Sequence, residues 1–253
     1  MKKIVMKFGG TSIASGENIR HVANLLSNYV GQGYRVVAVV SALGKVTDKL
    51  TEVAEQAKKG NRDYLNEFKQ KLLKEHITAA RKAIENKGIR EEMEQILETT
   101  IDELEKVLTG IFYVGELTPK SEDYVLSFGE RLSTPIVWGA LRDLGLNAQF
   151  YTGGEVGIVT DSNFGEASPL MKVTKHQVRE KIEPLLEKRI VPVVTGYIAA
   201  TQDDVTTTLG RGGSDYTATI IGAALAVDEV WIWTDVDGLM TSDPKTVPSA
   251  RMV

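Results

Sequence analysis

The stretch Thr206-Thr-Thr-Leu-Gly-Arg-Gly-Gly-Ser-Asp215 leads directly into an apolar run at residues 216–226 whose composition predicts a helix. Its glycines would let backbone N–H groups come close to an anion that a Cβ would keep away. The helix that follows would direct the positive end of its dipole to the same place. Arg211, Ser214 and Asp215 add a guanidinium, a hydroxyl and a carboxylate. The stretch is therefore suited to binding phosphates and small acids.

A second glycine turn lies near the other end of the chain, where Lys7-Phe-Gly-Gly-Thr-Ser12 continues an apolar run at residues 4–8. Gly9 and Gly10 would let the backbone approach phosphate oxygens, and Lys7 would place a positive charge among them. On spacing alone, a solvated lysine in an ordinary tight turn fits equally well. Two such turns in one chain indicate phosphoryl transfer, provided that they converge on one site.

Strands and helices alternate along most of the chain, which predicts an α/β fold. A strand at 4–8, a helix at 15–30 and a β-branched strand at 34–40 predict a βαβ unit with its glycine turn after the first strand. The later elements are predicted helices at 121–144, 175–188 and 215–226, strands at 147–151, 156–160, 190–195 and 229–234, and part of a hairpin at 205–208. We expect a three-layer αβα sandwich with a mostly parallel central sheet.

Residues 47–108 interrupt this alternation with a region rich in Glu and Lys whose apolar residues recur at helical spacing. Gly60-Asn61 and Lys87-Gly88 divide the region into three predicted helices. We interpret residues 48–109, approximately, as a helical insertion on the sheet. Its charged side chains are expected to form a solvated face.

Composition excludes several classes of function. The net charge of −4 leaves no electrostatic footprint for nucleic acid or an anionic membrane. The absence of cysteine excludes disulfides and thiolate chemistry, and the scattered histidines form no set with the spacing of metal ligands. No apolar run reaches the roughly 20 residues that a membrane span needs. Because no secretory signal follows Met1, we expect a cytoplasmic protein.

Five motifs, in order and with the expected spacing, resemble the catalytic domain of aspartate kinase, in the amino-acid kinase superfamily. They are Lys7-Phe-Gly-Gly-Thr-Ser12, Val40-Ser-Ala42 with Thr47, Ser127-Phe-Gly-Glu-Arg131, Thr208-Leu-Gly-Arg-Gly-Gly-Ser-Asp215 and Thr234-Asp-Val-Asp-Gly238. The resemblance covers residues 1–253. It implies ATP-dependent phosphorylation of the side-chain carboxylate of L-aspartate to 4-phospho-L-aspartate, the first step toward lysine, threonine and methionine. It also implies a homodimer or a larger homo-oligomer.

The resemblance assigns roles to individual residues. Lys7 is implied to be the catalytic lysine, and Asp215 to position catalytic groups. The residues implied to bind aspartate are Ser41, Thr47, Glu130, Arg211 and Ser214. Those implied to bind the nucleotide are Lys7, Gly9, Gly10, Ser12, Thr234, Asp235, Gly238, Met240 and Lys245. Met240 replaces the family's usual tyrosine, and Lys245 replaces its commoner arginine. Magnesium is expected because ATP chemistry brings it, and no residue is assigned as a metal ligand.

Some of these residues also have ordinary structural interpretations. Thr47 is a natural N-cap for a helix that begins at Asp48. An isolated glutamate on a helix, such as Glu130, usually faces solvent. Asp215 fits a simple cap at the start of a helix. Tyr197 resembles a family aromatic near the substrate, or a buried core tyrosine.

The resemblance also divides the chain, into a substrate-binding lobe at 1–190 and a nucleotide-binding lobe at 191–253. We expect this second lobe to be incomplete at its C-terminus, because the family supplies another active-site lysine beyond that point, and we expect no ACT regulatory domains. Two alternatives stay open. One is an amino-acid kinase for glutamate, acetylglutamate or carbamate, and the other is a non-catalytic small-molecule-binding or regulatory fragment.

Overall fold

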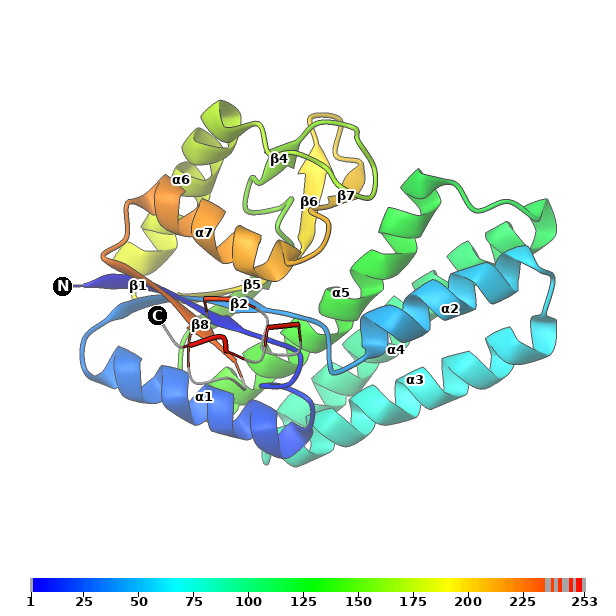
Figure 1. Cartoon of the computed structure of the whole chain (residues 1–253). Helices are drawn as coiled ribbons and strands as arrows, with labels where there is room; N and C mark the ends of the chain where they lie inside the picture. The colour runs from blue at the N-terminus through cyan, green and yellow to red at the C-terminus, as the bar shows by residue number, and fades with distance from the viewer. Residues whose placement is uncertain (1, 235–237, 239–240, 243–245, 248, 252–253) are drawn as a thin grey trace.

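The computed structural model describes residues 2–234, 238, 241–242, 246–247 and 249–251. A five-stranded sheet with the strand order β3-β5-β2-β1-β8 runs through its centre (Figure 1). The strands are β1 (Lys3–Phe8), β2 (Arg35–Val40), β3 (Ala148–Tyr151), β5 (Val191–Thr195) and β8 (Glu229–Trp233). Every neighbouring pair in this sheet is parallel, as the sequence predicted.

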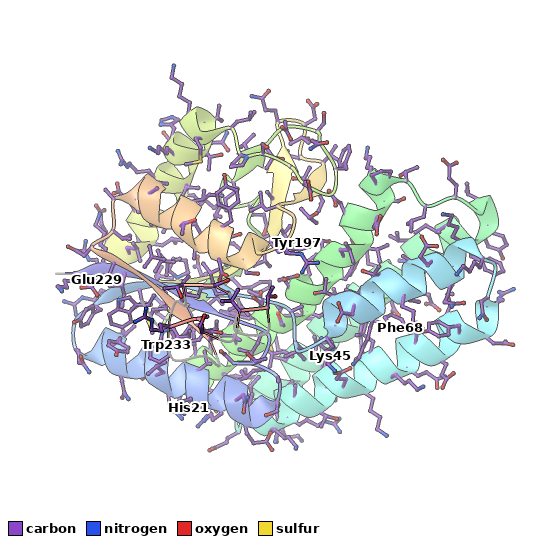
Figure 2. The ribbon with its side chains drawn as sticks, viewed as in Figure 1. His21, Lys45, Phe68, Tyr197, Glu229 and Trp233 are labelled. Atoms are coloured by element: carbon purple, nitrogen blue, oxygen red, sulfur yellow. The ribbon has the colours of Figure 1, made fainter. Side chains whose placement is uncertain are left out.

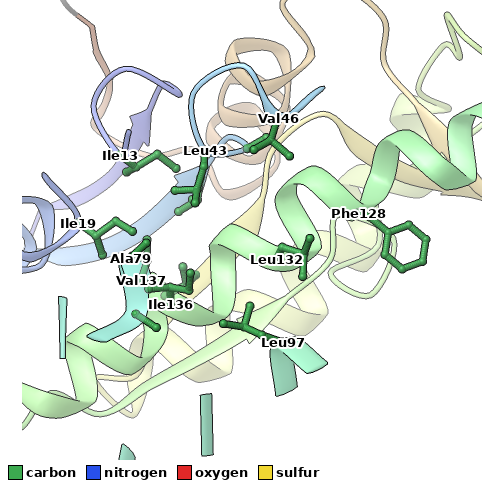
Figure 3. Packing of buried hydrophobic residues seen from close by; sticks show 14 of the residues in the cluster. Ile13, Ile19, Leu43, Val46, Ala79, Leu97, Phe128, Leu132, Ile136 and Val137 are labelled. Carbon is green, nitrogen blue, oxygen red and sulfur yellow. The ribbon is translucent and has the colours of Figure 1, made fainter. Parts of the chain in front are cut away.

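Helices cover both faces of the sheet (Figure 1). One face carries α1 (Gly16–Gly31) and α5 (Pro119–Asp143), and the other carries α6 (Met171–Glu187) and α7 (Gly213–Leu225). Alternation along β1 supplies both cores, because Ile4, Met6 and Phe8 pack on the α1 and α5 side while Val5 packs on the α6 and α7 side. Figure 3 shows side chains of the first core gathered around α5. The predicted three-layer sandwich is confirmed.

Three long helices form the predicted insertion: α2 (Val46–Lys58), α3 (Arg62–Ala83) and α4 (Lys87–Val114). Their apolar faces join the core around α5. The break predicted at Lys87-Gly88 lies earlier, because Asn86 caps α4 by accepting a 3.1 Å hydrogen bond from the Ile89 amide. None of the helices in the described part of the chain has both the length and the hydrophobicity that crossing a membrane requires.

A second, three-stranded sheet lies beside α5. Its strands are β4 (Val159–Thr160), β6 (Ile198–Thr201) and β7 (Thr206–Thr208), in the order β4-β6-β7. The antiparallel pairing of β6 with β7 confirms the predicted hairpin. The strand predicted at 156–160 is shorter than expected, because residues 153–157 form consecutive turns. The helix predicted at 175–188 begins four residues earlier, at Met171.

His76 is a fully buried titratable side chain on α3. Its Nδ1 lies 2.8 Å from the carbonyl oxygen of Leu72, and its Nε2 is buried without a hydrogen-bond partner among the described residues. Burial lowers the pKa of His76 below its ordinary 6.5, an effect that Lys49 reinforces and that the Leu72 carbonyl and Glu75 oppose. The folded chain therefore holds this ring in its neutral form.

Replacing His76 with leucine is expected to make the fold less sensitive to acid. Below about pH 6.5 the unfolded chain protonates this side chain and the folded chain does not, so the free energy of unfolding falls as the pH drops. Between about pH 7.5 and about pH 5, the wild type should lose ~1–2 kcal/mol more than His76→Leu in urea unfolding. His176→Gln, at an exposed histidine, should behave as the wild type. Equal losses in the wild type and His76→Leu would contradict the prediction.

Candidate active site

The two glycine loops meet at one ion pair. Lys7 points to the same side of β1 as Val5, toward α7, because side chains alternate along a strand. Asp215 lies in the first turn of α7. The Lys7 Nζ and the Asp215 Oδ1 are 2.6 Å apart, with the lysine nearly buried and the aspartate about half exposed. The predicted convergence of the two loops is thus confirmed.

An open cleft of about 610 Å³ surrounds this ion pair. It lies beyond the carboxyl ends of β1 and β2, where ligands of open α/β sheets bind. The predicted site residues that line it are Lys7, Gly9, Gly10, Ser41, Thr47, Glu130, Arg211, Ser214 and Asp215. In Figure 2, Tyr197 lies between α7 and α5, and Lys45 lies at the start of α2. Both of these side chains also line the cleft.

Two glycines let neighbouring segments approach the loop after β2 closely. A Cβ at Gly10 would lie 3.0 Å from the carbonyl oxygen of Ala42, and a Cβ at Gly129 would lie 2.9 Å from the Ala42 Cβ. The first glycine turn and α5 therefore pack against the same short loop. This packing brings Glu130, the residue after Gly129, to the floor of the cleft.

Glu130 has an unusual environment for a carboxylate. It is 3% exposed, and its Oε2 is buried without a hydrogen-bond partner among the described residues. Burial raises the pKa of Glu130 to about 8, against the opposing hydrogen bonds from the Ala42 and Glu130 backbone amides. The solvent-facing interpretation of this glutamate is wrong. A buried carboxylate in a cleft, with no ion pair to a described lysine or arginine, is suited to binding a cationic group.

The loop between β2 and α2 holds its residues through the backbone. The Ser41 amide donates to the Phe8 carbonyl oxygen at 3.1 Å, and the Ser133 hydroxyl donates to the Ser41 carbonyl oxygen at 2.7 Å. The expected N-cap at Thr47 is wrong, because α2 begins at Val46 and Thr47 lies in its first turn. Lys45 precedes the helix with a left-handed φ of 61° and no side-chain cap. Thr47 is thus available to the cleft.

Arg211 comes from the glycine loop before α7, and Ser214 is the second residue of that helix. Arg211 is exposed at the cleft and forms no ion pair with a described residue. Ser214 packs against Gly196, where a Cβ would lie 2.5 Å from the Ser214 Oγ. The helix predicted from Asp215 begins two residues earlier, at Gly213, with no side-chain cap. Asp215 lies in its first turn and pairs with Lys7, so the interpretation of Asp215 as a simple cap is wrong. One guanidinium, one hydroxyl and one ion pair therefore face Glu130 across the cleft.

The predicted nucleotide residues are only partly described. The Ser12 hydroxyl donates to the Trp233 carbonyl oxygen at 3.4 Å, which connects the first glycine turn to the end of β8. Thr234 follows β8 directly, and Thr234 and Gly238 are both exposed. The remaining predicted residues, Asp235, Met240 and Lys245, lie outside the described residues. Ser12, Thr234 and Gly238 do not line the cleft itself.

Sequence reasoning missed three charged residues of the cleft, Lys45, Asp48 and Glu166. Glu166 belongs to an irregular loop at 161–168 that carries no motif. Lys45 follows Gly44, but nothing in the sequence shows that its backbone is left-handed. Tyr197 is half-buried with a φ of 67°, and burial raises the pKa of its hydroxyl to about 12. Tyr197 lines the cleft and also packs against the hydrophobic core around α5, so the structure bears out both interpretations.

A second hollow lies between α3 and α4, with Phe68, Leu104 and Leu108 among its lining residues. It contains none of the predicted site residues. An apolar groove between two packed helices needs no chemical role. The converging charges and glycine loops of the open cleft make it the candidate active site.

Comparison with known proteins supports the same assignment. The model of the amino acid kinase family matches residues 2–253. Aspartokinase 2, chloroplastic, from Arabidopsis thaliana is 37% identical over 254 residues, which cover 98% of this chain and 45% of that protein. Aspartokinase from Mycolicibacterium smegmatis is 33% identical over 253 residues, which cover 99% of this chain and 45% of that protein. The chain thus spans about half the length of these relatives.

A solved structure shows the same architecture. E. coli aspartokinase III in complex with aspartate and ADP superposes with a TM-score of 0.86 and 28% sequence identity, over 100% of this chain and 53% of that one. The match of the family model extends over nearly the whole chain, and the fold is the αβα sandwich described above. The chain is therefore a member of the amino acid kinase family and is similar, within it, to the aspartokinases.

Proposed function

We propose that this chain transfers the γ-phosphoryl group of ATP to the side-chain carboxylate of L-aspartate, giving ADP and 4-phospho-L-aspartate. One observation carries the proposal: the Lys7–Asp215 ion pair lines the same cleft as Glu130, whose buried carboxylate has no counter-ion among the described residues. A cation suits the phosphates, and a buried anion suits a substrate ammonium. The likeness to an aspartokinase that binds aspartate and ADP supports this substrate pair.

Aspartate has one ammonium and two carboxylates, and the cleft offers a partner for each kind of group. Glu130 would pair with the ammonium, which would supply the counter-ion that this buried carboxylate does not find among the described residues. Arg211 presents a planar fork of donors that matches a carboxylate. Ser41, Thr47 and Ser214 add hydroxyls that donate hydrogen bonds. A neutral or purely anionic substrate would leave Glu130 unpaired.

ATP would place its phosphates over Lys7, Gly9 and Gly10, facing the loop that begins at Gly210. The rest of the nucleotide would extend toward Ser12 and the segment after β8, which contains Thr234, Asp235, Gly238, Met240 and Lys245. We propose that ATP enters as its magnesium complex. The described residues contain no cluster of three or more metal-binding side chains, which fits an ion bound mainly by phosphate oxygens and water.

The proposed reaction is a direct in-line transfer. A carboxylate oxygen of aspartate forms a bond to the γ-phosphorus while the bond to the bridging oxygen breaks and ADP leaves. The acceptor carboxylate is already ionised at neutral pH, so no general base is needed. Lys7 would stabilise the negative charge that moves during transfer, and Asp215 would hold the lysine in place. Positioning of the two substrates supplies the rest of the catalysis.

An ADP-coupled assay with a panel of acids tests the proposal. With ATP and magnesium present, we expect turnover with L-aspartate to exceed that with glutamate, N-acetylglutamate or carbamate by about 10²-fold in kcat/KM. Faster turnover of another acid would make the chain an amino-acid kinase for that substrate. ATP and aspartate binding without turnover would favour the non-catalytic alternative.

The biological setting is likewise a proposal. Phosphorylation of aspartate would place the chain in lysine and threonine biosynthesis. We propose a cytoplasmic location and a homodimer or larger assembly, with a plastid location as the alternative because one relative is chloroplastic. The division into a substrate-binding lobe at 1–190 and a nucleotide-binding lobe at 191–253 stays a prediction.

A further inference from the structure

We propose that Asp123 is a positioning residue that fastens two loops of the cleft to the helix that carries Glu130. The role in turnover rests on the proposed function. The Asp123 Oδ2 accepts hydrogen bonds from the backbone amides of Gly165 and Thr208, each at 3.0 Å. Its Oδ1 accepts a third, at 2.6 Å, from the Thr208 hydroxyl. Three segments distant in sequence thus meet at one carboxylate.

Each of these segments forms a wall of the cleft. Asp123 and Glu130 lie seven residues apart on α5, about two helical turns, and so share one side of the helix. Thr208 ends β7 and stands two residues before Gly210, where the glycine loop begins. Gly165 lines the cleft together with Glu166. The Ala167 amide also donates to the Thr208 carbonyl oxygen at 2.9 Å, so the two loops are joined to each other.

The environment of Asp123 points to positioning. The side chain is 1% exposed and pairs with no described lysine or arginine. Burial raises its pKa, and the hydrogen bonds from Thr208 and Gly165 oppose the rise. A buried carboxylate without a cation contributes little to the stability of the fold. Its three directed hydrogen bonds instead fix the positions of the two loops relative to α5. Tyr197, which lines the cleft, is joined to the same segment, because its carbonyl oxygen accepts a 2.9 Å hydrogen bond from the Leu209 amide.

The test alters the hydrogen-bonding groups of Asp123 and Thr208 one residue at a time and measures the KM for aspartate and the KM for ATP. Asp123→Asn and Thr208→Val are each expected to raise the KM for aspartate about 10- to 100-fold, because the loop that carries Arg211 and Ser214 loses its anchor. The KM for ATP should change less than about threefold, because Lys7 and its glycine turn have no bond to Asp123. Thr208→Ser keeps the hydroxyl donor and should restore the wild-type KM for aspartate.

Asp143 provides a matched control on the same helix. Its buried carboxylate accepts hydrogen bonds from the amides of Glu85 and Asn86, at 3.0 and 2.9 Å, outside the cleft, and unlike Asp123 it also pairs with Arg20. Asp143→Asn should lower the free energy of unfolding and leave the KM for aspartate within about twofold of wild type. If Asp123→Asn instead raises the KM for aspartate and the KM for ATP equally, the role of Asp123 is only structural and the proposal is overturned.

Amide hydrogen exchange tests the anchor without any assay of turnover. Exchange of the Gly165 and Thr208 amides should be at least about tenfold faster in Asp123→Asn than in the wild type. Exchange of the amides within α5 should be unchanged. If the wild-type chain makes no ADP from ATP and aspartate, the proposed function is refuted. Amide exchange still decides, in that case, whether Asp123 holds the two loops in place. Wild-type exchange in both Asp123→Asn and Thr208→Val would refute the anchor itself.

Discussion

Replacing Lys7 with methionine is expected to lower kcat for aspartate phosphorylation by about 10²- to 10³-fold, because a preorganised charge at the reacting groups contributes roughly 3–4 kcal/mol to the stability of the transition state. Methionine keeps the apolar stem that packs beside β1, so the loss reports the charge rather than a cavity. Lys7→Ala should show a loss of similar size. The measurement is kcat at saturating aspartate and ATP in the ADP-coupled assay.

Lys3 is a matched control for this substitution, because it lies on the same strand and forms a 3.3 Å ion pair with Glu183 at the opposite end of β1. Lys3→Met should leave kcat within about twofold of wild type, since ion pairs of this exposure contribute little. Urea unfolding should give Lys7→Met a stability near that of the wild type, because the Asp215 carboxylate that loses its partner is about half exposed to solvent. A kcat within about threefold of wild type in Lys7→Met would exclude the proposed mechanism.

Glu130→Gln is the second substitution with a large expected effect. The amide has nearly the shape of the carboxylate but cannot pair with an ammonium, so the substrate charge would be buried without a partner. The KM for aspartate should rise by about 10²- to 10³-fold, which corresponds to roughly 3–4 kcal/mol. The KM for ATP should stay within about threefold. Glu116→Gln, at an exposed position between α4 and α5, should match the wild type in both constants.

The pKa of Glu130 gives this prediction a pH signature. Because that pKa is about 8 in the free protein, only about one molecule in a hundred has the carboxylate ionised at pH 6. Aspartate binds only the protein molecules in which Glu130 is ionised. The KM of the wild type for aspartate should therefore fall roughly tenfold for each unit of pH between about 6 and 8. In Glu130→Gln this dependence should vanish. A flat wild-type profile would show that Glu130 does not bind the ammonium.

Stability should change in the opposite direction. A carboxylate whose pKa is raised from 4.5 to about 8 favours the fold when protonated, so it destabilises the fold progressively as the pH rises through this range. The shift corresponds to a free energy on the order of 5 kcal/mol. Glu130→Gln should therefore unfold at a higher urea concentration than the wild type at about pH 8. Gain of stability with loss of substrate binding is the pattern expected of a site residue.

The sequence predicted the sheet and the convergence of the two loops for a definite reason. Apolar strands buried on both faces are recognisable as runs, such as residues 34–40, and the glycine turn after β1 falls at the carboxyl edge of the parallel sheet. The glycine loop before α7 follows β7 of the second sheet instead. The roles of Lys7 and Asp215 came from the resemblance, because spacing alone fits a solvated lysine in a tight turn equally well. The helical insertion was predicted from its apolar periodicity, with its boundaries displaced by a few residues at most.

The misplaced features depend on contacts that local sequence does not show. Thr47 has the chemistry of an N-cap, yet the left-handed backbone at Lys45 starts α2 before it. Gly88 is a helix breaker by composition, yet it falls in the first turn of a capped helix, where a glycine is tolerated. The burial of Glu130 and the three bonds to Asp123 arise only when α5 packs against loops far along the chain.

The central position of β1 in the sheet constrains how the chain folds during its synthesis. Its first edge pairs with β2 early, but its second edge pairs with β8, at residues 229–233. During synthesis at ~5–20 residues per second, a ribosome would leave that second edge unsatisfied for ~10–40 s. An apolar strand with a bare edge can recruit another nascent chain. We therefore expect high yields of folded protein to depend on a low concentration of nascent chains or on chaperones that cover this edge until β8 emerges.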